Sequence, residues 1–407
     1  MKKYSIILVL CIIISGCVTT TLSPMTASDF SFEDDEMRLW VRSEEEEKII
    51  NESGLVYKDE ELENYLNQVA NKLEPNDIFK HFPFRIMVIK DPALNAFTFP
   101  NGVIYIHTGL LSRMDNEAQL ATLIGHEIIH YTQRHGLKQF RSLKNKTAFL
   151  ATVKMAASGV GGDIGRLVNL VGSIGTVAAI TGYSRKSERE ADMEGFKLVS
   201  EAGYDTEESP KLFFCILKEE IKNDKERKEP FFFSSHPRLQ ERINSYQDLL
   251  KTKYQSQQGG IIKTKYQSQQ GGIRNTDIFL KKIHRAILDN ARLDLKIGRF
   301  KIAQKGVEKY LKINPDDANA YSLLGDIFSQ RGNEGDTGKA KEYYQKSISK
   351  DLSCPSSYKG IGLIHYKLGN KQLAKEFFEQ YLVLLPHAFD REYIEMYINQ
   401  CNAGARR

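Results

Sequence analysis

The chain has 407 residues and a formal net charge of +5, with 57 lysines and arginines against 52 acidic residues. This length is more than one ordinary domain needs, so we expect two globular units joined by a connector. The basic residues are scattered among the acidic ones instead of forming a dense stripe. We therefore expect no nucleic-acid partner.

The N-terminus has the layout of a secretory signal peptide. Two lysines precede an apolar run from Ile6 to Ile14, which is too short to span a membrane comfortably. The letters "ISGC", which end at Cys17, resemble the bacterial lipobox, and this implies removal of residues 1–16 and a lipid on Cys17. Because Val18 stands where an aspartate would retain an inner-membrane lipoprotein, the resemblance favours an anchor in the outer membrane, facing the periplasm of a Gram-negative bacterium. The alternative is an ordinary signal peptide and a soluble periplasmic protein.

Such processing would leave three cysteines, Cys215, Cys354 and Cys401. Three cysteines cannot form a disulfide framework, and their spacing is not that of zinc ligands. A bridge between Cys354 and Cys401 stays open, so we expect the hydrophobic cores to stabilise the chain.

Residues 17–35 are polar and acidic and predict a tether. Residues 57–73 place apolar side chains at steps of three and four, which predicts an amphipathic helix. The stretches "FPFRIMVIKD" and "GVIYIHTG" predict two strands of a small sheet, separated by the turn-like "DPALNAFTFPNG". From Asn116 the apolar spacing becomes helical, so a helix is expected to carry the letters "HEIIH".

The segment 147–183 is apolar and rich in glycine, but Asp163 and Arg166 interrupt any stretch of membrane-spanning length. We expect buried helices broken by a Gly-rich loop there. Whether this segment also covers a nearby site stays open from the sequence.

Residues 251–273 contain the unit "KTKYQSQQGGI" twice, and a flexible connector tolerates such a duplication best, so we place a linker at 251–275. Beyond it, "AYSLLGDIFSQRG" and "SYKGIGLIHYKLG" align, with small residues where paired helices would touch. They resemble the tetratricopeptide repeat, a helix-turn-helix unit of about 34 residues. Three units fit, near 284–317, 318–354 and 355–388, and a capping helix would follow. A plain array of helical hairpins is the alternative.

His126 and His130 stand four apart in "HEIIH", so in a helix they lie on nearly the same face and can converge on one ion. Glu127 points about 100° away, where it can reach a water at the metal without being a ligand. This is the arrangement of zinc metallopeptidases, in which one zinc ion (Zn2+) acidifies water and polarises the scissile carbonyl while the glutamate takes up the proton. The alternative is a buried helix whose histidines bond to the backbone.

A catalytic zinc site needs a third protein ligand, and "YSRKSEREADMEGFKLV" offers Glu188 and Asp192 with helical spacing. Here the chain resembles the zinc metallopeptidase family that includes the CaaX prenyl protease, the mitochondrial inner-membrane quality-control protease and the bacterial β-barrel assembly-enhancing protease. The resemblance covers about 57–243 and includes "NAFTFPNGVIYIHTGLL", "GHEIIH", "EREAD" and "SSHPRLQERI". It implies Glu188 as third metal ligand and Asp192 as a group that orients a ligand histidine. Glu190 lies off the face that these two share and is expected to be solvated.

Three further histidines are interpreted separately. His135 is turned roughly 140° from His130, so we expect a structural or solvent-facing residue, and His107 is expected to be structural. His236 matches a histidine-proline block of the family, which leaves open a plain loop histidine or a residue that lies over the metal and closes or assists the site. Val103–His107 is expected to be an edge strand beside the cleft, where substrate could add as a further strand.

The sequence thus predicts an α+β, zincin-like, mostly helical metalloprotease domain with a small sheet at 36–250, followed by an all-α tetratricopeptide solenoid at 276–407. The expected protein is a lipid-anchored periplasmic zinc endopeptidase that acts on unfolded polypeptides. By resemblance, its repeats would hold misassembled outer-membrane proteins or an assembly machine near the cleft. The alternative is a chaperone-like scaffold with a latent or structural metal site. An intramembrane prenyl-type protease is set aside, because the sequence lacks the spans it requires.

Overall fold

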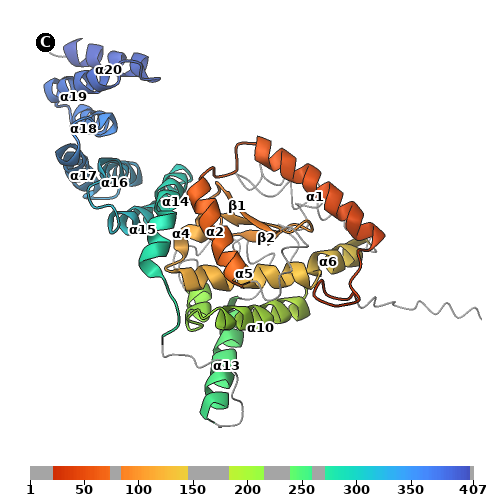
Figure 1. Ribbon diagram of the computed structural model, residues 1–407. Coiled ribbons are helices and arrows are strands. Elements are labelled where there is room, and N and C mark those ends of the chain that lie inside the picture. Colours follow the sequence, from red (N-terminus) through yellow and green to blue (C-terminus); the bar gives the residue numbers. More distant parts are fainter. Residues whose placement is uncertain (1–21, 74–83, 145–182, 215–238, 259–270, 404–407) are drawn as a thin grey trace, which may run out of the picture.

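The computed structural model describes residues 22–73, 84–144, 183–214, 239–258 and 271–403. Helices and one small sheet form a compact body at the N-terminal side, and further helices extend from it as an arm (Figure 1). The predicted fold class is confirmed: a mostly helical α+β domain precedes an all-α solenoid.

The sheet has three strands, β1 (Arg85–Ile89), β2 (Ala96–Thr98) and β3 (Val103–His107), in the order β1-β3-β2. β3 is parallel to β1 and antiparallel to β2. The expectation of an edge strand at Val103–His107 is therefore wrong, because this strand is central and fully buried. The two outer strands are β1 and β2, and β2 lies in the stretch that the sequence predicted as a turn.

β2 is hard to detect in the sequence because it has only three residues, all buried, and no alternation of polar and apolar side chains. Aromatic packing across the sheet supports it: the ring of Phe97 lies 5.2 Å from that of Tyr105 on β3. No strand among the described residues pairs with the outer side of β2.

Helices α5 (Glu117–Thr132) and α10 (Arg185–Glu201) pack side by side below the sheet in Figure 1. α5 starts where predicted, because the side chain of Asn116 accepts a hydrogen bond from the backbone N–H of Gln119 and caps the helix. α2 (Glu60–Leu73) confirms the amphipathic helix predicted for this region, with its apolar face buried. α6 (His135–Lys144) continues beyond α5, and the short α4 (Thr108–Arg113) follows β3.

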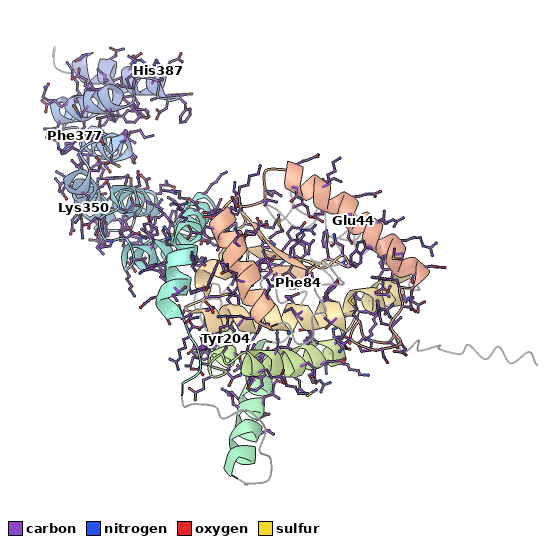
Figure 2. The ribbon with its side chains drawn as sticks, viewed as in Figure 1. Glu44, Phe84, Tyr204, Lys350, Phe377 and His387 are labelled. Carbon is purple, nitrogen blue, oxygen red and sulfur yellow. The ribbon has the colours of Figure 1, made fainter. Side chains whose placement is uncertain are left out.

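α1 (Asp34–Glu52) runs along the other side of the sheet, and Glu44 lies on its exposed outer face (Figures 1 and 2). The residues before α1 are packed from Leu22 onward, although the sequence placed them in a tether. Leu22 and Met25 are buried, and the Met25 N–H donates to the carbonyl of Thr132 at 2.8 Å. Arg134 holds this segment by donating to the carbonyls of Ser23 at 3.0 Å and Ser31 at 3.4 Å, and its buried ion pair with Glu36 ties it to α1.

The connector between the two parts is ordered at both ends. α13 (Leu239–Gln258) enters the first copy of the duplicated unit, and residues 259–270 lie outside the described residues. The end of the second copy returns to the first domain, where the Ile273 N–H donates to Gly203 O at 2.9 Å. The Asp205 N–H donates to Ile273 O at 3.0 Å, so this part of the predicted flexible linker is paired with the domain.

Three helical hairpins and a last helix form the arm: α14 (Thr276–Lys296), α15 (Phe300–Leu311), α16 (Ala318–Arg331), α17 (Asp336–Lys350), α18 (Pro355–Lys367), α19 (Lys371–Leu384) and α20 (Arg391–Ala403). Glycines allow close helix contacts, as predicted: a Cβ on Gly325 or Gly360 would come within 2.4 or 2.3 Å of the Tyr344 ring. The first hairpin starts earlier than the predicted residue 284, since α14 begins at Thr276, and this helix packs on α2 and α4.

Two sequence questions about the described residues are answered by the fold. Cys354 and Cys401 are buried free thiols, so the disulfide that stayed open is not formed. None of the helices that the structure describes is long and apolar enough to cross a membrane.

Candidate metal centre

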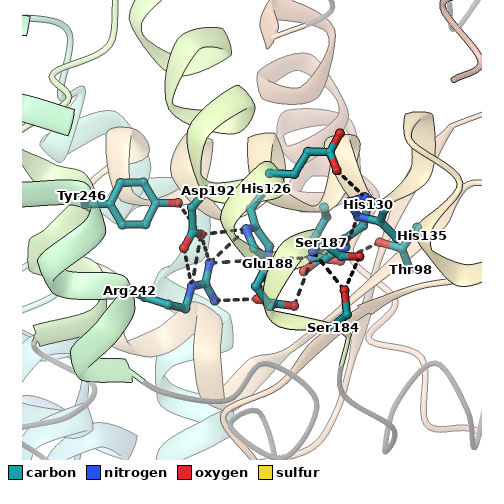
Figure 3. Close-up of polar contacts among 12 residues, drawn as sticks. Thr98, His126, His130, His135, Ser184, Ser187, Glu188, Asp192, Arg242 and Tyr246 are labelled. Carbon is teal, nitrogen blue, oxygen red and sulfur yellow. Dashed lines mark hydrogen bonds and ion pairs between the residues drawn. The ribbon is translucent and has the colours of Figure 1, made fainter. Parts of the chain in front are cut away.

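Two helices bring three potential metal ligands together. His126 and His130 lie one turn apart on α5, and Glu188 lies on α10; one ligand atom from each falls within 4.8 Å of the others. All three side chains are buried. Figure 3 shows Glu188 beside the two imidazoles.

The spacing of the donor atoms fits one small divalent ion. The Nε2 atoms of the histidines are 2.9 Å apart, and the Glu188 oxygens lie 3.6 Å from His126 Nε2 and 3.4 Å from His130 Nε2. Tetrahedral coordination with bonds of about 2.0–2.1 Å requires separations of about 3.3 Å. Two nitrogens and a carboxylate on one side also leave a further position open, which is the donor set of catalytic zinc.

Glycines set the distance between the two ligand-bearing helices. Gly125 and Gly195 face each other where α5 crosses α10, and a Cβ on Gly195 would lie 3.0 Å from the backbone N of His126. Only residues without a side chain permit this approach. The glycine pair therefore keeps Glu188, which is two turns before Gly195, within reach of the histidines.

His126 is oriented through its other nitrogen. Its Nδ1 lies 3.0 Å from Asp192 Oδ1 and 2.9 Å from Arg242 Nη2. One nitrogen cannot donate and accept at once, and the charged Asp192 makes donation from Nδ1 the favourable choice. Nε2 is then unprotonated and can bind a metal. Burial, aided by the positive charge of Arg242, lowers the pKa of His126 to about 4, which also favours the neutral ring.

Arg242 was missed by the sequence interpretation. It lies on α13, and its guanidinium contacts Asp192 Oδ1 at 2.6 Å and stacks 4.2 Å from the centre of the Phe213 ring. Tyr246, one turn later, donates to the same Asp192 oxygen at 3.1 Å. Both contacts are drawn in Figure 3. The signal was available, since Arg242 belongs to the block "SSHPRLQERI" that the sequence already singled out.

His130 also has a partner at its second nitrogen. His135 Nδ1 lies 2.9 Å from His130 Nδ1, so His135 is neither solvent-facing nor remote from the site. The ring of Tyr183 stacks on His130, with centroids 3.8 Å apart. Glu190 is about a third exposed and lies 3.5 Å from His135 Nε2, outside the ligand group.

Glu127 points toward the edge strand. The hydroxyl of Thr98, the last residue of β2, donates to Glu127 Oε2 at 2.7 Å. A small crevice beside this pair is lined by residues of β2, α5 and the N-terminal segment, among them Met25, Thr98 and His130. The sequence interpretation missed Thr98, whose role depends on β2 being the edge.

Other predicted residues cannot be placed. Cys17, His236 and nearly all of the Gly-rich segment 147–183 lie outside the described residues. His107 is fully buried, 3.3 Å from Asp91, in keeping with the structural role expected for it.

Comparisons with known proteins find relatives of both parts of the chain. Residues 58–250 match the family described as "Peptidase family M48", and residues 356–382 match the tetratricopeptide repeat. The putative β-barrel assembly-enhancing protease of Vibrio cholerae is 28% identical over 203 residues, which cover 48% of this chain and 40% of that protein. The β-barrel assembly-enhancing protease of Yersinia pestis is 30% identical over 38% of this chain and 32% of that protein. The chain thus matches less than half the length of either relative.

A shorter relative is matched over more of its length. The metalloprotease LoiP of Escherichia coli (strain K12) is 29% identical over 45% of this chain and 68% of that protein. The residues that match the family model run from α2 into α13, so they include both ligand-bearing helices and Arg242.

Proposed function

We propose, from the premise that residues 58–250 belong to peptidase family M48, that this protein is a zinc-dependent metalloendopeptidase. The observation that carries the proposal is the convergence of His126, His130 and Glu188. Beside them lies Glu127 of α5, which accepts a hydrogen bond from Thr98 on the edge strand β2. When bound, the zinc ion would acidify water near neutral pH and polarise the scissile carbonyl.

The residues of the chain supply binding and proton transfer. His126, His130 and Glu188 would hold the ion, and Asp192 would fix the His126 ring with Nε2 toward it. Arg242 balances the charge of Asp192 and holds its carboxylate in place. Glu127 would take the proton of the attacking water and pass it to the leaving nitrogen.

Thr98 has a defined part in this chemistry. Its hydroxyl donates to one oxygen of Glu127, and the carboxylate is thereby fixed in one orientation. Because the hydroxyl belongs to the edge strand, the base and the strand that would bind substrate keep a constant separation. This arrangement favours a polypeptide substrate in extended form.

The outer side of β2 is the place where such a substrate would bind. An extended chain can add to the edge of a sheet through backbone hydrogen bonds, which give affinity with loose sequence selectivity. Unfolded or misassembled proteins expose extended backbone, so they are the substrate class that we propose.

The proposal also covers where the protein is located and which proteins its repeats bind. The lipobox-like residues before Cys17 support a lipid-anchored protein of the periplasm, at the outer membrane, and two relatives are named for β-barrel assembly. The tetratricopeptide repeats would then hold envelope-protein clients, or assembly machinery, near the cleft. The runner-up is a chaperone-like scaffold with a latent metal site.

A comparison of two proteins tests the function. The wild type, purified with zinc, should bind one ion per chain and cleave an unfolded polypeptide, and a chelator should abolish cleavage. Glu127→Gln should keep the zinc but lose at least about a hundredfold in kcat, since general-base catalysis contributes roughly 10²–10⁴. Cleavage by Glu127→Gln at the wild-type rate would contradict the role of Glu127 as the base. Protection of clients by both proteins without cleavage would favour the scaffold.

A further inference from the structure

We propose that the first repeat hairpin, α14 and α15, is a positioning element of the peptidase site, and that Arg299 and Asn290 hold the strand on which substrate would bind. The inference rests on the proposed function for its consequence, but its structural part stands on contacts alone. The contacts act through the loop Asp91–Asn95, which joins β1 to β2 and is called the β1–β2 loop below.

The hairpin is built onto the peptidase domain. One hydrophobic cluster of buried residues runs without interruption from Leu62 on α2, through α5, to Ile327 on α16. Polar contacts accompany it: Tyr57 donates to Asp289 at 2.8 Å, and Arg113 donates to Asp294 at 3.0 Å. In Figure 1, α14 lies against α2 and α4, while the later hairpins extend away from the body. The first hairpin therefore differs from the later ones, because it packs against the peptidase domain as well as against the next repeat.

Arg299 reaches the β1–β2 loop directly. It lies in the turn between α14 and α15, and its Nη1 donates to the carbonyl of Pro92 at 3.1 Å. The same Nη1 lies 3.5 Å from Asp294 Oδ1, a carboxylate that is fully buried. A charged donor held by a buried anion gives the Pro92 carbonyl a fixed partner.

Asn290 reaches the same loop through Thr108. The Thr108 hydroxyl lies 3.0 Å from Asn290 Oδ1 and 3.0 Å from the carbonyl of Asp91, and it accepts from the Asp91 N–H at 3.2 Å. Asn290 is only 1% exposed, and its amide donates to Asp294 at 2.8 Å. Burial of the polar pair Asn290 and Asp294 costs free energy unless both side chains form hydrogen bonds. Here their partners, Thr108 and Arg113, belong to the peptidase domain.

The β1–β2 loop also packs tightly against the first turn of α4. The Gly109 N–H donates to Asp91 O at 2.9 Å, and a Cβ on Gly109 would lie 2.3 Å from the carbonyl oxygens of Pro92 and Ala93. The loop is thus pressed onto the first turn of α4, and Arg299 binds the Pro92 carbonyl at this contact.

The loop leads immediately into the edge strand and the catalytic base. Asn95 O accepts from the His107 N–H at 3.0 Å, β2 begins at Ala96, and Thr98 binds Glu127. A strand of three residues with one neighbour has few contacts of its own, so its position depends on the segments at its ends. Loss of the Arg299 contact should loosen β2 and, with it, the pairing of an added substrate strand.

The test compares full-length, zinc-loaded Arg299→Ala with wild type and with Arg331→Ala. Arg331 is the matched control, because its ion pair with Asp336 lies inside the repeats and not at the β1–β2 loop. Hydrogen exchange of peptides covering 91–107 should be faster in Arg299→Ala by about tenfold, and unchanged in Arg331→Ala. Asn290→Ala serves as a second variant with the same expected direction.

Kinetics give the second readout. For an unfolded polypeptide, Arg299→Ala should raise KM by about fivefold, the pattern of lost substrate binding. It should lower kcat by less than about tenfold, because the Thr98 hydroxyl beside Glu127 is loosened but not removed. Zinc content should equal that of wild type. Wild-type exchange at 91–107 in Arg299→Ala overturns the positioning role. Faster exchange with unchanged KM overturns the link to substrate binding. An inactive wild type would contradict the proposed function, and exchange would still decide the positioning role.

Discussion

Thr98 on the edge strand and Glu127 on α5 are joined by a 2.7 Å hydrogen bond between the hydroxyl and Oε2. The bond connects the sheet to the helix that carries the histidines, and both residues are buried. Because the carboxylate is the proposed proton acceptor, its orientation should affect the chemical step more than substrate affinity.

Replacement of Thr98 by valine keeps the shape and removes the hydroxyl. We expect kcat to fall by about tenfold, a part of the total that general-base catalysis contributes, while zinc content stays at one ion per chain. Steady-state kinetics on an unfolded polypeptide measure this. Thr122→Val is the control. Thr122 also lies on α5, and its buried hydroxyl bonds the carbonyl of Ala118 and the hydroxyl of Ser209 instead of Glu127. Equal loss of kcat in both variants would assign the effect to α5 packing.

Arg242 and Asp192 form a buried ion pair beside a proposed ligand, and removal of one partner should affect both folding and metal binding. Arg242→Met leaves Asp192 buried without its cation, so the free energy of unfolding should fall by about 3–5 kcal/mol. Zinc affinity should fall by about 10–100-fold, because the carboxylate no longer holds His126 in place. Urea denaturation and zinc titration measure the two effects.

The double variant Arg242→Met with Asp192→Asn separates them. It removes both charges, so stability should recover in part, whereas zinc affinity should stay low because the anionic partner of His126 is gone. Recovery of zinc affinity together with stability would show that the pair acts on the metal site only through folding.

The distance between the ligand-bearing helices offers a third test. Gly195→Ala places a methyl group 3.0 Å from backbone atoms of Gly125 and His126, so α5 and α10 must separate by a few tenths of an ångström. The proposed ligand Glu188 moves with α10, and we expect zinc affinity to fall by roughly tenfold, within the range for misplaced metal-site geometry. Gly136→Ala is the control, because nothing lies within 4 Å of its Cβ and its φ is not positive. Isothermal titration of both variants would decide, and equal affinities would contradict the role of the crossing.

A site residue could be predicted from the sequence where its spacing from other residues fixes its position in the fold. His126 and His130 could be placed on one face, because helix geometry converts a step of four into adjacency. The same periodicity predicted α2 correctly, and the repeats were found through their small residues. Glu188 came from a resemblance, since 57 residues lie between it and His130 and no local rule places it.

The missed features are those set by tertiary contacts. β2 is too short to show periodicity, so neither the true edge of the sheet nor Thr98 could be recognised. Arg242 becomes meaningful only when α13 packs against α10. The duplicated linker looked flexible by composition, yet Ile273 pairs with the peptidase domain through backbone bonds that composition does not encode.

Two buried histidines, the proposed ligand His126 and His135 beside the site, should also make the stability of the metal-free protein depend on pH. Burial lowers the pKa of His126 to about 4 and that of His135 to about 2, from a usual value of 6.5. Below pH 6.5 the unfolded chain therefore binds protons that the folded chain does not bind. The stabilisation is fully present above pH 6.5 and is lost as the pH falls toward the folded pKa values.

For His126 alone, the loss between pH 6.5 and 4 is on the order of 3 kcal/mol of unfolding free energy. Urea midpoints in the presence of a chelator should fall from pH 7 to pH 5, a window above the usual pKa of most carboxylates. His126→Gln should show a shallower decline, because glutamine does not titrate. Zinc in excess should reduce the decline in the wild type, since the ion binds only the neutral rings. A metal-free wild type that is as stable at pH 5 as at pH 7 would show that folding does not lower the pKa values of these two imidazoles, and the predicted pH dependence would be wrong.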